Sequence, residues 1–548
     1  MSRGRSHKQM APVLKGIERR EKVRAVEWLA GRLALLPARW ADYVRKEHKR
    51  RGGLPSAAAN AWALAVTESG KGRLSLAASD DDLRQAAKIA AAEGVDIAAL
   101  GGAREGGRLR EMLAFHCARW QVAAPGPEIE EGPAIRRMVC SRWWLRRLRR
   151  SHGRACERAA IVAGVVRRGL WVYATQDCVE RRGAQRRRNA RAIDRAVVEC
   201  AEYGESLALA DVVAGSMANP EVKRAELMVR IKGCDAVATE NGDSCQFWTL
   251  TAPSSFHRMR MLGGVPVTNP NFDEENPKTP KDGQKHLSTV WARARAKWKR
   301  RGLQVFGLRT AEPHHDATPH WHLIAYGPAA QLVEAAEILR AYALQDEPSE
   351  AGAFEHRFKA MEARAGTKGA AYAAKYVSKN IDGKGLEGDI DSEGQKKISA
   401  SVKRVDAWAA TWGIRQFQFF GCPAISGWRV LRRMRGPVAV VGSVLERARQ
   451  AADDSDFAGY WRAVESGALS LIYRAADALT VYGDAAAARI VGIAEGARRA
   501  LLPVKEWVIR WGGPAKAGGF GLPWSCVNNC TGSDLPFDVP VRAGACAG

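Results

Sequence analysis

Hydrophobic spacing divides the chain into helical ends around a mixed centre. Residues 1–130 repeat apolar side chains at the helical interval, with glycine-rich breaks at 52–53 and 101–107. Residues 426–510 return to alanine- and arginine-rich sequence of the same kind, ahead of a glycine-rich run at 512–521. Both ends are therefore expected to be largely α-helical.

The central part of the chain has short runs typical of β-strands. They read QFWTLTAP, LQVFGLRT and HWHLIAYG, and helical stretches occur at 283–301 and 369–380. This alternation favours an α+β fold with a mostly antiparallel sheet. The expected order is a helical region of unknown role, an arginine-rich helical region, the α+β domain, and a helical C-terminal region with an irregular tail. The corresponding boundaries are 1–130, 131–238, 239–425 and 426–548.

Composition adds a strong positive charge to this picture. The 548 residues include 85 lysines and arginines against 59 acidic residues, a formal net charge of +26. Such an excess favours a polyanionic partner, because these side chains displace counterions from phosphates. An arginine-rich sequence from a GC-rich genome is the plainer alternative. Hydrophobic residues make up 46% of the chain, which excludes a mainly disordered protein.

Half of the charge excess lies in one block, residues 136–200. The block has 18 arginines, no lysine and five acidic residues, a net charge of +13. Guanidinium groups bind phosphate oxygens bidentately, and the aromatic residues between them, such as Trp143 and Trp144, could stack on bases. A solvated helix face with core tryptophans would give the same pattern. The arginines expected to contact DNA are Arg146, Arg147, Arg149, Arg150, Arg186, Arg187 and Arg188.

The cysteine pattern and the lack of long apolar runs indicate the cellular compartment of the protein. The 11 cysteines are an odd number without a C-x-x-C pair, which argues against a disulfide framework and a zinc ribbon. No apolar region follows the basic N-terminus, and no apolar run is long enough to span a membrane. We expect a soluble protein of a reducing cytoplasm.

Two histidines and a glutamate form a candidate metal site. His320 and His322 are two residues apart on an expected strand, so both project from the same face. If the preceding strand pairs with it as a hairpin, Glu312 lies across from His320. Two imidazoles and a carboxylate suit Mg²⁺ or Mn²⁺ acting on a phosphate. His314 and Asp316 are alternative ligands from the loop, and a structural pair of surface histidines is the other interpretation.

Two tyrosines form a candidate nucleophile pair. Tyr372 and Tyr376 are four residues apart on an expected helix and share a face, with Lys375 and Lys379 beside them. A phenol has a pKa near 10, and nearby ammonium groups would favour the phenolate. A phenolate that attacked a phosphodiester would become linked to DNA. Two core tyrosines on an amphipathic helix would look the same.

A TLT strand, the H-x-H pair and the Y-x-x-x-Y helix follow one another in a specific order. The combination resembles the HUH endonucleases that start rolling-circle replication, in their two-tyrosine branch. The chain is most similar to the replication gene A proteins of P2-like temperate phages. The resemblance covers residues 130–425 well and the two ends weakly. It rests on FWTLTAPSSFH (247–257), the segments 290–327, 370–382 and 406–421, and more loosely on RRMVCSRWWLRRLRR and PWSCVNNCTG.

The resemblance implies a fold and a role for each of these residues. The fold is a central antiparallel HUH-type sheet with flanking helices, with the metal ligands on central strands and the tyrosines on a helix above them. The paired histidines correspond to metal ligands and, less securely, Glu312 to the third. The two tyrosines correspond to the nucleophiles, and the lysines beside them would assist at the phosphate.

The implied activity is replication initiation for a phage or prophage. Such an enzyme nicks single-stranded DNA at an origin, keeps the 5′ phosphate on a tyrosine, frees a 3′-OH for a polymerase and later rejoins the strand. The chain has no G-x-x-x-x-G-K-[ST] loop, so a host helicase and DNA polymerase are expected partners in the bacterial cytoplasm. Alternatives are a relaxase or transposase with the same chemistry, or a non-catalytic DNA-binding replication protein.

Overall fold

The chain forms two compact units, each described here by itself. One takes in the residues up to Trp171 together with His257–Thr279, and the other takes in Val172–Phe256 and the residues from Pro280 on. The four domains expected from the sequence stay a prediction. The glycine-rich run at 512–521 and the PWSCVNNCTG segment lie outside the described residues. The computed structural model describes residues 7–511 except 55, 70–71, 102–105, 201, 203, 364–368, 384–397, 435, 476–478 and 503–506.

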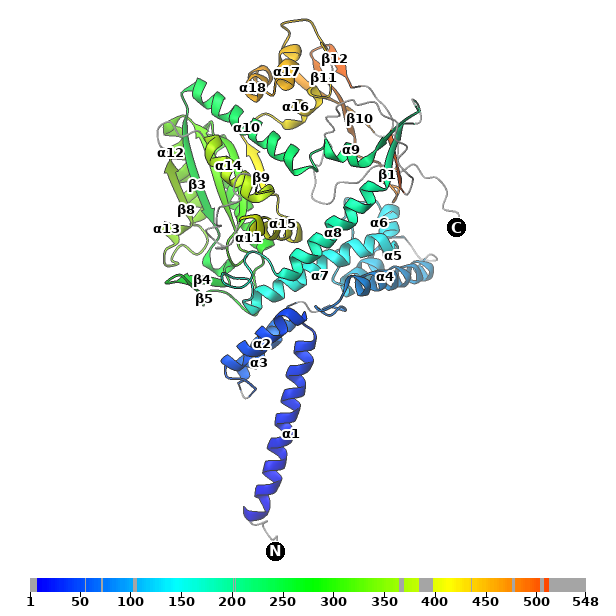
Figure 1. The fold of residues 1–548 in the computed structure, drawn as a ribbon, viewed down its shortest axis with the longest axis vertical. Helices are drawn as coiled ribbons and strands as arrows, with labels where there is room; N and C mark the ends of the chain where they lie inside the picture. The colour runs from blue at the N-terminus through cyan, green and yellow to red at the C-terminus, as the bar shows by residue number, and fades with distance from the viewer. Residues whose placement is uncertain are drawn as a thin grey trace. The chain divides into compact units, whose positions relative to one another are not determined.

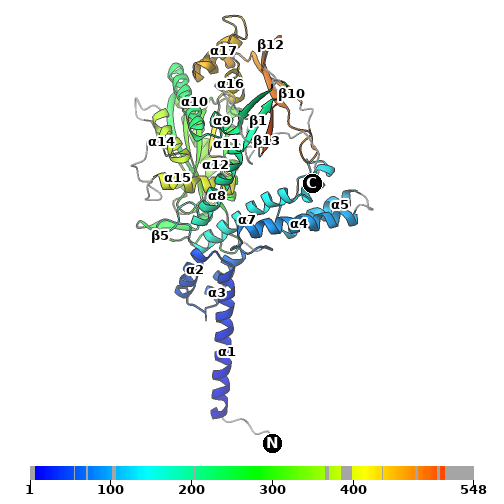
Figure 2. The same cartoon turned by 45° about the vertical axis from the view of Figure 1, so that its right-hand side comes forward.

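In its described residues the first unit is helical apart from one hairpin, which confirms the helical expectation for the N-terminal region. Helices α4 and α7 run side by side in both ribbon views (Figures 1 and 2). The hairpin is joined to α7 by Arg258, whose Nε donates to the carbonyl of Val162 at 3.0 Å. The elements are α1 (His7–Ala34), α2 (Ala38–Arg50), α3 (Ala57–Glu68), α4 (Asp80–Gly101), α5 (Gly106–Arg119), α6 (Glu131–Met138), α7 (Ser141–Ala163), β4 (Met259–Leu262) and β5 (Val265–Thr268).

The second unit is built around a five-stranded antiparallel sheet of order β8-β3-β7-β6-β9. This confirms the α+β class and the antiparallel sheet. Its strands are β3 (Ser244–Thr251), β6 (Phe306–Pro313), β7 (Pro319–Gly327), β8 (Phe358–Glu362) and β9 (Phe417–Phe420). The helices of the same stretch are α10 (Pro220–Asn241), α11 (Pro280–Arg301), α12 (Ala329–Ala343), α13 (Ala353–His356), α14 (Gly369–Ile381), α15 (Ile398–Trp412) and the 3-10 turn η1 (Ser254–Phe256).

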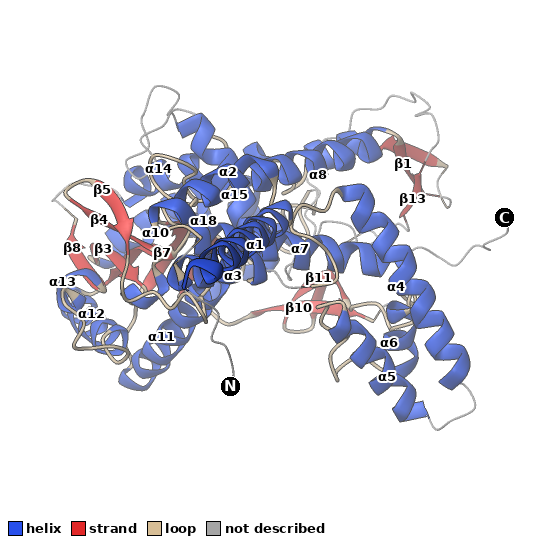
Figure 3. Cartoon of the chain, turned by 90° about the horizontal axis from the view of Figure 1, so that it is seen from below, coloured by secondary structure: helices blue, strands red, loops and turns tan. Residues whose placement is uncertain are grey.

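Helices cover both faces of this sheet. Helices α10 and α14 lie on one side and α11 and α12 on the other (Figure 3). On the first side, Leu308 and Ile324 pack with apolar residues of α10 and α14. On the second, the rings of Trp291 and Trp298 meet edge to face at 5.2 Å and pack against the tryptophans of the strands. Strand alternation therefore separates two cores, one on each face.

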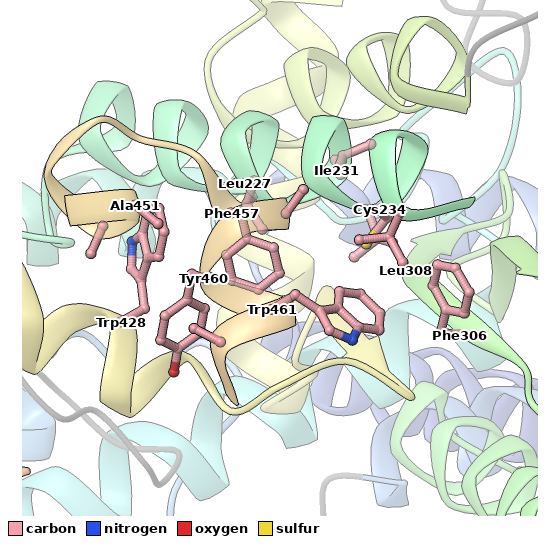
Figure 4. Close-up of a cluster of buried hydrophobic side chains, with 14 of the residues drawn as sticks. Leu227, Ile231, Cys234, Phe306, Leu308, Trp428, Ala451, Phe457, Tyr460 and Trp461 are labelled. Carbon is pink, nitrogen blue, oxygen red and sulfur yellow. The ribbon is translucent and has the colours of Figure 1, made fainter. Parts of the chain in front are cut away.

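The C-terminal part of the second unit begins with helices, as expected. Trp428, Phe457 and Trp461 pack against Leu227 and Ile231 of α10 (Figure 4). Trp461 also meets Phe306 of β6 edge to face at 5.0 Å. The helices therefore share the core of the sheet's first face. They are α16 (Ile425–Leu431), α17 (Val444–Asp453) and α18 (Phe457–Glu465).

The expectation of helix is wrong beyond Glu465 and also at the end of the arginine-rich region. There the structure has two small antiparallel sheets, of order β10-β11-β12 and β13-β1-β2. The first includes a tight turn at Gly496, which has a positive φ of 57°. The second pairs segments some 300 residues apart, and long-range pairing of this kind leaves no local pattern. The elements are α8 (Gln176–Asp194), β1 (Ala196–Cys200), β2 (Glu205–Ala208), α9 (Leu209–Ala214), β10 (Leu469–Arg474), β11 (Arg489–Glu495), β12 (Arg498–Leu501) and β13 (Trp507–Trp511).

Gly307 on β6 provides a test of the sheet. Its φ is +151°, and an added Cβ would collide with the carbonyl oxygen of Ile324 on β7. We predict that Gly307→Ala lowers the free energy of unfolding of the second unit by about 2–4 kcal/mol. Urea denaturation followed by tryptophan fluorescence measures this change.

The matched control is Gly153→Ala. Gly153 lies inside α7, and an added Cβ there meets nothing within 4 Å. Replacing this helical glycine should stabilise the first unit by about 0.5–1 kcal/mol. An unchanged unfolding midpoint in Gly307→Ala would contradict the close approach of β6 and β7.

Candidate active site

The hairpin of β6 and β7 places the glutamate opposite the first histidine. Glu312 pairs with His320 in the strand register, which confirms the expected hairpin. The turn between the strands is closed by Asp316, whose carboxylate accepts a hydrogen bond from the backbone N–H of Thr318 at 3.1 Å. Ala317 adopts a positive φ of 75° in this turn. The short, well-bonded turn leaves no freedom for the strands to shift register.

Three side chains converge on one face of the hairpin. The Nε2 atoms of His320 and His322 lie 2.8 Å apart, and Nε2 of His322 lies 3.9 Å from a carboxylate oxygen of Glu312. All three ligand atoms are within 4.8 Å of one another, and the described residues contain no other such group. Two nitrogens and one oxygen on one side of an ion leave positions open for phosphate oxygens. The donor set therefore fits a divalent cation.

The two alternative ligands have other surroundings. Asp316 is buried and holds the turn, as described above. The ring of His314 packs at a tilt against the ring of His320, with centroids 3.9 Å apart. The geometry therefore favours Glu312 as the third ligand over either loop residue.

The TLT strand supports the second histidine. Thr249 on β3 pairs with His322 in the register, and its hydroxyl lies 3.3 Å from Nδ1 of that ring. A hydrogen bond to one ring nitrogen fixes the orientation of an imidazole, and here the other nitrogen, Nε2, faces His320 and Glu312. Sequence reasoning used the strand as part of the motif but did not identify this contact.

The helix that carries the tyrosines is anchored at its start. Asp235 on α10 accepts hydrogen bonds from the N–H groups of Gly369 (3.0 Å) and Ala370 (2.8 Å) and from the hydroxyl of Tyr326 (2.6 Å). A carboxylate at this position satisfies free N–H groups and complements the positive end of the helix. A Cβ on Gly369 would collide with the Tyr326 hydroxyl. The first turn of α14 is thus held against the sheet.

The two phenols lie over the ligand face. Their hydroxyl oxygens are 2.8 Å apart, which makes them a hydrogen-bonded pair. The Tyr372 ring stacks on Phe247 of β3 with centroids 3.8 Å apart, and the Tyr376 ring lies 4.6 Å from that of His322. The structure therefore brings the tyrosine pair and the histidine pair into one site.

The pKa of both phenols is raised, contrary to the lowering expected from nearby lysines. Burial is the main cause at Tyr376, followed by its hydrogen bond to Tyr372 and the negative charge of Glu312. Burial also raises the pKa of Tyr372, while the hydrogen bond from Tyr376 opposes the rise. Both hydroxyls are therefore protonated at neutral pH in this state.

The two lysines beside the tyrosines have different surroundings. Lys379 donates to a carboxylate oxygen of Glu312 at 3.2 Å, whereas Lys375 is exposed. The side-chain amide of Asn380 donates to the other oxygen of Glu312 and, at 2.7 Å, to the carbonyl of Tyr376. Gln416 donates to the Asn380 oxygen at 3.3 Å. Sequence reasoning missed Asn380, although its position four residues after Tyr376 places it on the same helix face.

The first arginine cluster lies on α7 in the first unit. Arg149 makes two hydrogen bonds of 2.8 Å to Asp80, and the guanidinium of Arg147 lies 5.4 Å from the Trp143 ring. Arg146 is exposed and Arg150 is half-buried. Trp143 and Trp144 are buried in the core of this unit, so their rings are covered rather than open to bases.

The second arginine cluster lies on α8 in the second unit. Arg186 forms an ion pair with Asp406 at 2.9 Å, and Arg188 donates to Gln185 at 3.0 Å. Arg187 is exposed. Part of this charge therefore serves to attach α8 to α15, and part faces solvent.

None of the helices in the described part of the chain is both long enough and apolar enough to cross a bilayer.

Comparison with known proteins identifies relatives of the chain. Residues 111–384 match the model of the bacteriophage replication gene A protein family. The replication gene A protein of Escherichia phage P2 is 36% identical over 434 residues, which cover 74% of this chain and 56% of that protein. The probable replication protein P12 of Pseudoalteromonas phage PM2 is 35% identical over 410 residues, or 72% of this chain and 62% of that protein.

A probable replication endonuclease from a prophage-like region of Salmonella paratyphi A is 31% identical over 449 residues, or 74% of this chain and 54% of that protein. The chain thus spans little more than half the length of these curated relatives. No solved structure gives a significant match. The family match extends over half of the chain and includes both histidines, Glu312 and both tyrosines, and the chain belongs to the bacteriophage replication gene A protein family.

Proposed function

We propose that the chain is a replication endonuclease that nicks one DNA strand by tyrosine attack and starts rolling-circle replication. The observation that carries the proposal is the pair of phenol hydroxyls, 2.8 Å apart, over a face that bears two histidines and a glutamate. Relatives named as replication gene A proteins and probable replication endonucleases support it. In this proposal the enzyme acts in the cytoplasm of a bacterial host, with a host helicase and DNA polymerase as partners.

The proposed reaction exchanges one phosphodiester for another. The phenol oxygen loses its proton and forms a bond to phosphorus, the bond from phosphorus to O3′ breaks, and the departing O3′ takes up a proton, so that one proton passes from phenol to O3′ overall. The tyrosine retains the 5′ phosphate, and the free 3′-OH serves the polymerase. After a round of synthesis the second tyrosine cleaves the regenerated origin, and the released 3′-OH attacks the first phosphotyrosine. Because the number of ester bonds is unchanged, no ATP is needed.

The residues of the site have separate roles in the proposed reaction. A bound Mg²⁺ or Mn²⁺ would polarise the phosphate and neutralise charge on its oxygens. His320, His322 and Glu312 would hold that ion, and Thr249 and Asn380 would orient two of these ligands. The raised phenol pKa values mean that a proton must leave the attacking hydroxyl as the substrate binds. The hydrogen bond between the phenols lets the second hydroxyl stabilise charge on the first.

The exposed arginines supply binding rather than chemistry in this proposal. Arg146, Arg186 and Arg187 are exposed, although Arg186 also pairs with Asp406, and the half-buried Arg149 pairs with Asp80. Exposed guanidinium groups contact phosphates without regard to sequence, so they would hold the DNA while the tyrosine site acts.

The first prediction concerns the nucleophiles. Tyr372→Phe/Tyr376→Phe should lose the covalent link to single-stranded origin DNA completely, because no phenol oxygen remains to attack. Binding of the same DNA should change less than about threefold, since only two hydroxyls are removed. The adduct is measured as labelled DNA that stays with the protein in a denaturing gel with Mn²⁺.

Tyr342→Phe serves as the control for this pair. Tyr342 lies on α12, on the other side of the sheet, and should form the adduct normally. An undiminished adduct in the double variant, or none in the wild type, would reject tyrosine chemistry.

The second prediction concerns the metal. His320→Ala should weaken Mn²⁺ binding by at least about 100-fold and abolish nicking, while DNA binding and the unfolding midpoint are retained. Calorimetry measures the Mn²⁺ affinity. His356→Ala replaces an exposed histidine of α13 and should behave as wild type. If His320→Ala unfolds the protein or binds Mn²⁺ normally, the histidine pair is structural.

The third prediction concerns Asn380. Removal of its amide frees one oxygen of Glu312, so Asn380→Ala should weaken Mn²⁺ binding by about 10–100-fold. Ser378→Ala, two residues earlier on the same helix, should leave the Mn²⁺ affinity unchanged. Equal affinities in both variants would show that Lys379 alone positions the carboxylate.

A further inference from the structure

The second face of the sheet carries a buried arginine that the tyrosine site does not use. Arg309 precedes Thr310 on β6, and Thr310 pairs with His322, so strand alternation places Arg309 on the opposite face. Its neighbour in the register on the edge strand β9 is Gln418. Arg309 is only 5% exposed.

Aromatic packing covers the flat side of this guanidinium but not its edge. The central carbon lies 3.6 Å from the centroid of Trp321 and 6.0 Å from that of Trp291. A guanidinium has five N–H donors in its plane, and stacking leaves all of them unused. Within the described part of the chain, Arg309 has no hydrogen bond to its side chain and no acidic partner. None of its nitrogens is among the fully buried polar atoms without a partner, so the edge of the guanidinium reaches the surface, where an acceptor from outside can bind.

The charges around Arg309 select the chemistry of that acceptor. Burial, and then the positive charges of Arg415 and Arg295, lower the pKa of Arg309 to about 9. Arg295 lies on α11 and Arg415 lies two residues before β9, and both are exposed. An anion would relieve the mutual repulsion of the three guanidinium groups and accept their hydrogen bonds. A tetrahedral phosphate offers several oxygens to such a cluster.

We propose that Arg309, with Gln418 beside it and Arg295 and Arg415 around it, binds a backbone phosphate of the DNA strand on the face of the sheet opposite the tyrosines. The identification of the ligand as DNA rests on the proposed function, but this phosphate site shares no residue with the tyrosine site. Arg309 and Glu312 are three residues apart on β6, which is next to the edge strand. A strand that passes around β9 would reach both faces within a few nucleotides.

The first test measures DNA binding in the Tyr372→Phe/Tyr376→Phe chain, where cleavage does not interfere. Arg295→Glu/Arg415→Glu is compared with Arg498→Glu/Arg499→Glu, which reverses two exposed arginines of β12 and changes the net charge equally. The probe is a fluorescein-labelled single-stranded oligonucleotide of mixed sequence. Affinity should fall at least about tenfold more in the first variant, and its slope of log affinity against log salt should be shallower by about one. Equal losses in the two variants would overturn the assignment to DNA.

The second test measures the buried arginine with inorganic phosphate alone. Phosphate should raise the melting temperature of the wild type and not that of Arg309→Met, and the oligonucleotide should compete with it. If phosphate protects the wild type but the two pairs of charge reversals bind DNA equally, the site takes a free phosphate and the DNA assignment is wrong. If phosphate protects neither or both proteins alike, Arg309 is not an anion site.

The two tests can distinguish a failure of the phosphate site from a failure of the proposed function. If the wild type forms no covalent adduct, the nicking activity is rejected. The salt dependence of DNA binding by the Arg295→Glu/Arg415→Glu chain would still test the phosphate site. Conversely, normal adduct formation combined with equal DNA affinities would leave the nicking activity intact and reject only the phosphate site.

Discussion

The carboxylate of Glu312 is the contact on which both halves of the site depend. It lies on β6 across from His320, yet its two oxygens accept hydrogen bonds from Lys379 and Asn380 of the tyrosine helix. The side chain is 2% exposed, so loss of these partners would leave a buried charge unsatisfied at a cost of about 3–5 kcal/mol. The strand with the candidate metal ligands and the helix with the phenols are therefore held as one piece. Burial is the main cause of the raised pKa of both phenols, and the negative charge of the same carboxylate adds to it.

The rest of the second unit keeps that contact in place. Asp235 fixes the first turn of α14, while Asn380 and Lys379 fix its last turn through Glu312. The helix is thus anchored at both ends, with the two tyrosines between the anchors. The C-terminal helices add to the core beneath α10, which carries Asp235. Residues far apart in the chain thereby control the distance between phenol and imidazole, and the proposed reaction at a single phosphate would depend on rigid support of this kind.

Positively charged side chains have different partners on the two faces of the sheet. On the first face, the charge of Lys379 is neutralised by its ion pair with Glu312. On the second, Arg309 stacks on Trp321 among other positive groups. In the helices outside the sheet, Arg149 and Arg186 pair with aspartates. A net charge of +26 is thus divided among ion pairs, stacked arginines and exposed side chains, which bear on DNA affinity to different degrees.

The sequence by itself determined only those features that depend on residues near one another in the chain. Alternation over 320–327 predicts a strand with His320 and His322 on one face, and the spacing of Tyr372 and Tyr376 predicts neighbours on one helix, since both follow from the period of the backbone. The turn after Glu312 was short enough to predict the hairpin register as well. Tertiary structure alone decided which groups meet across elements. It placed Asn380 and Lys379 on Glu312, buried the phenols so that their pKa rises, and paired β1 with β13. These contacts join segments distant in sequence, and burial and charge at each group depend on packing that no local period specifies.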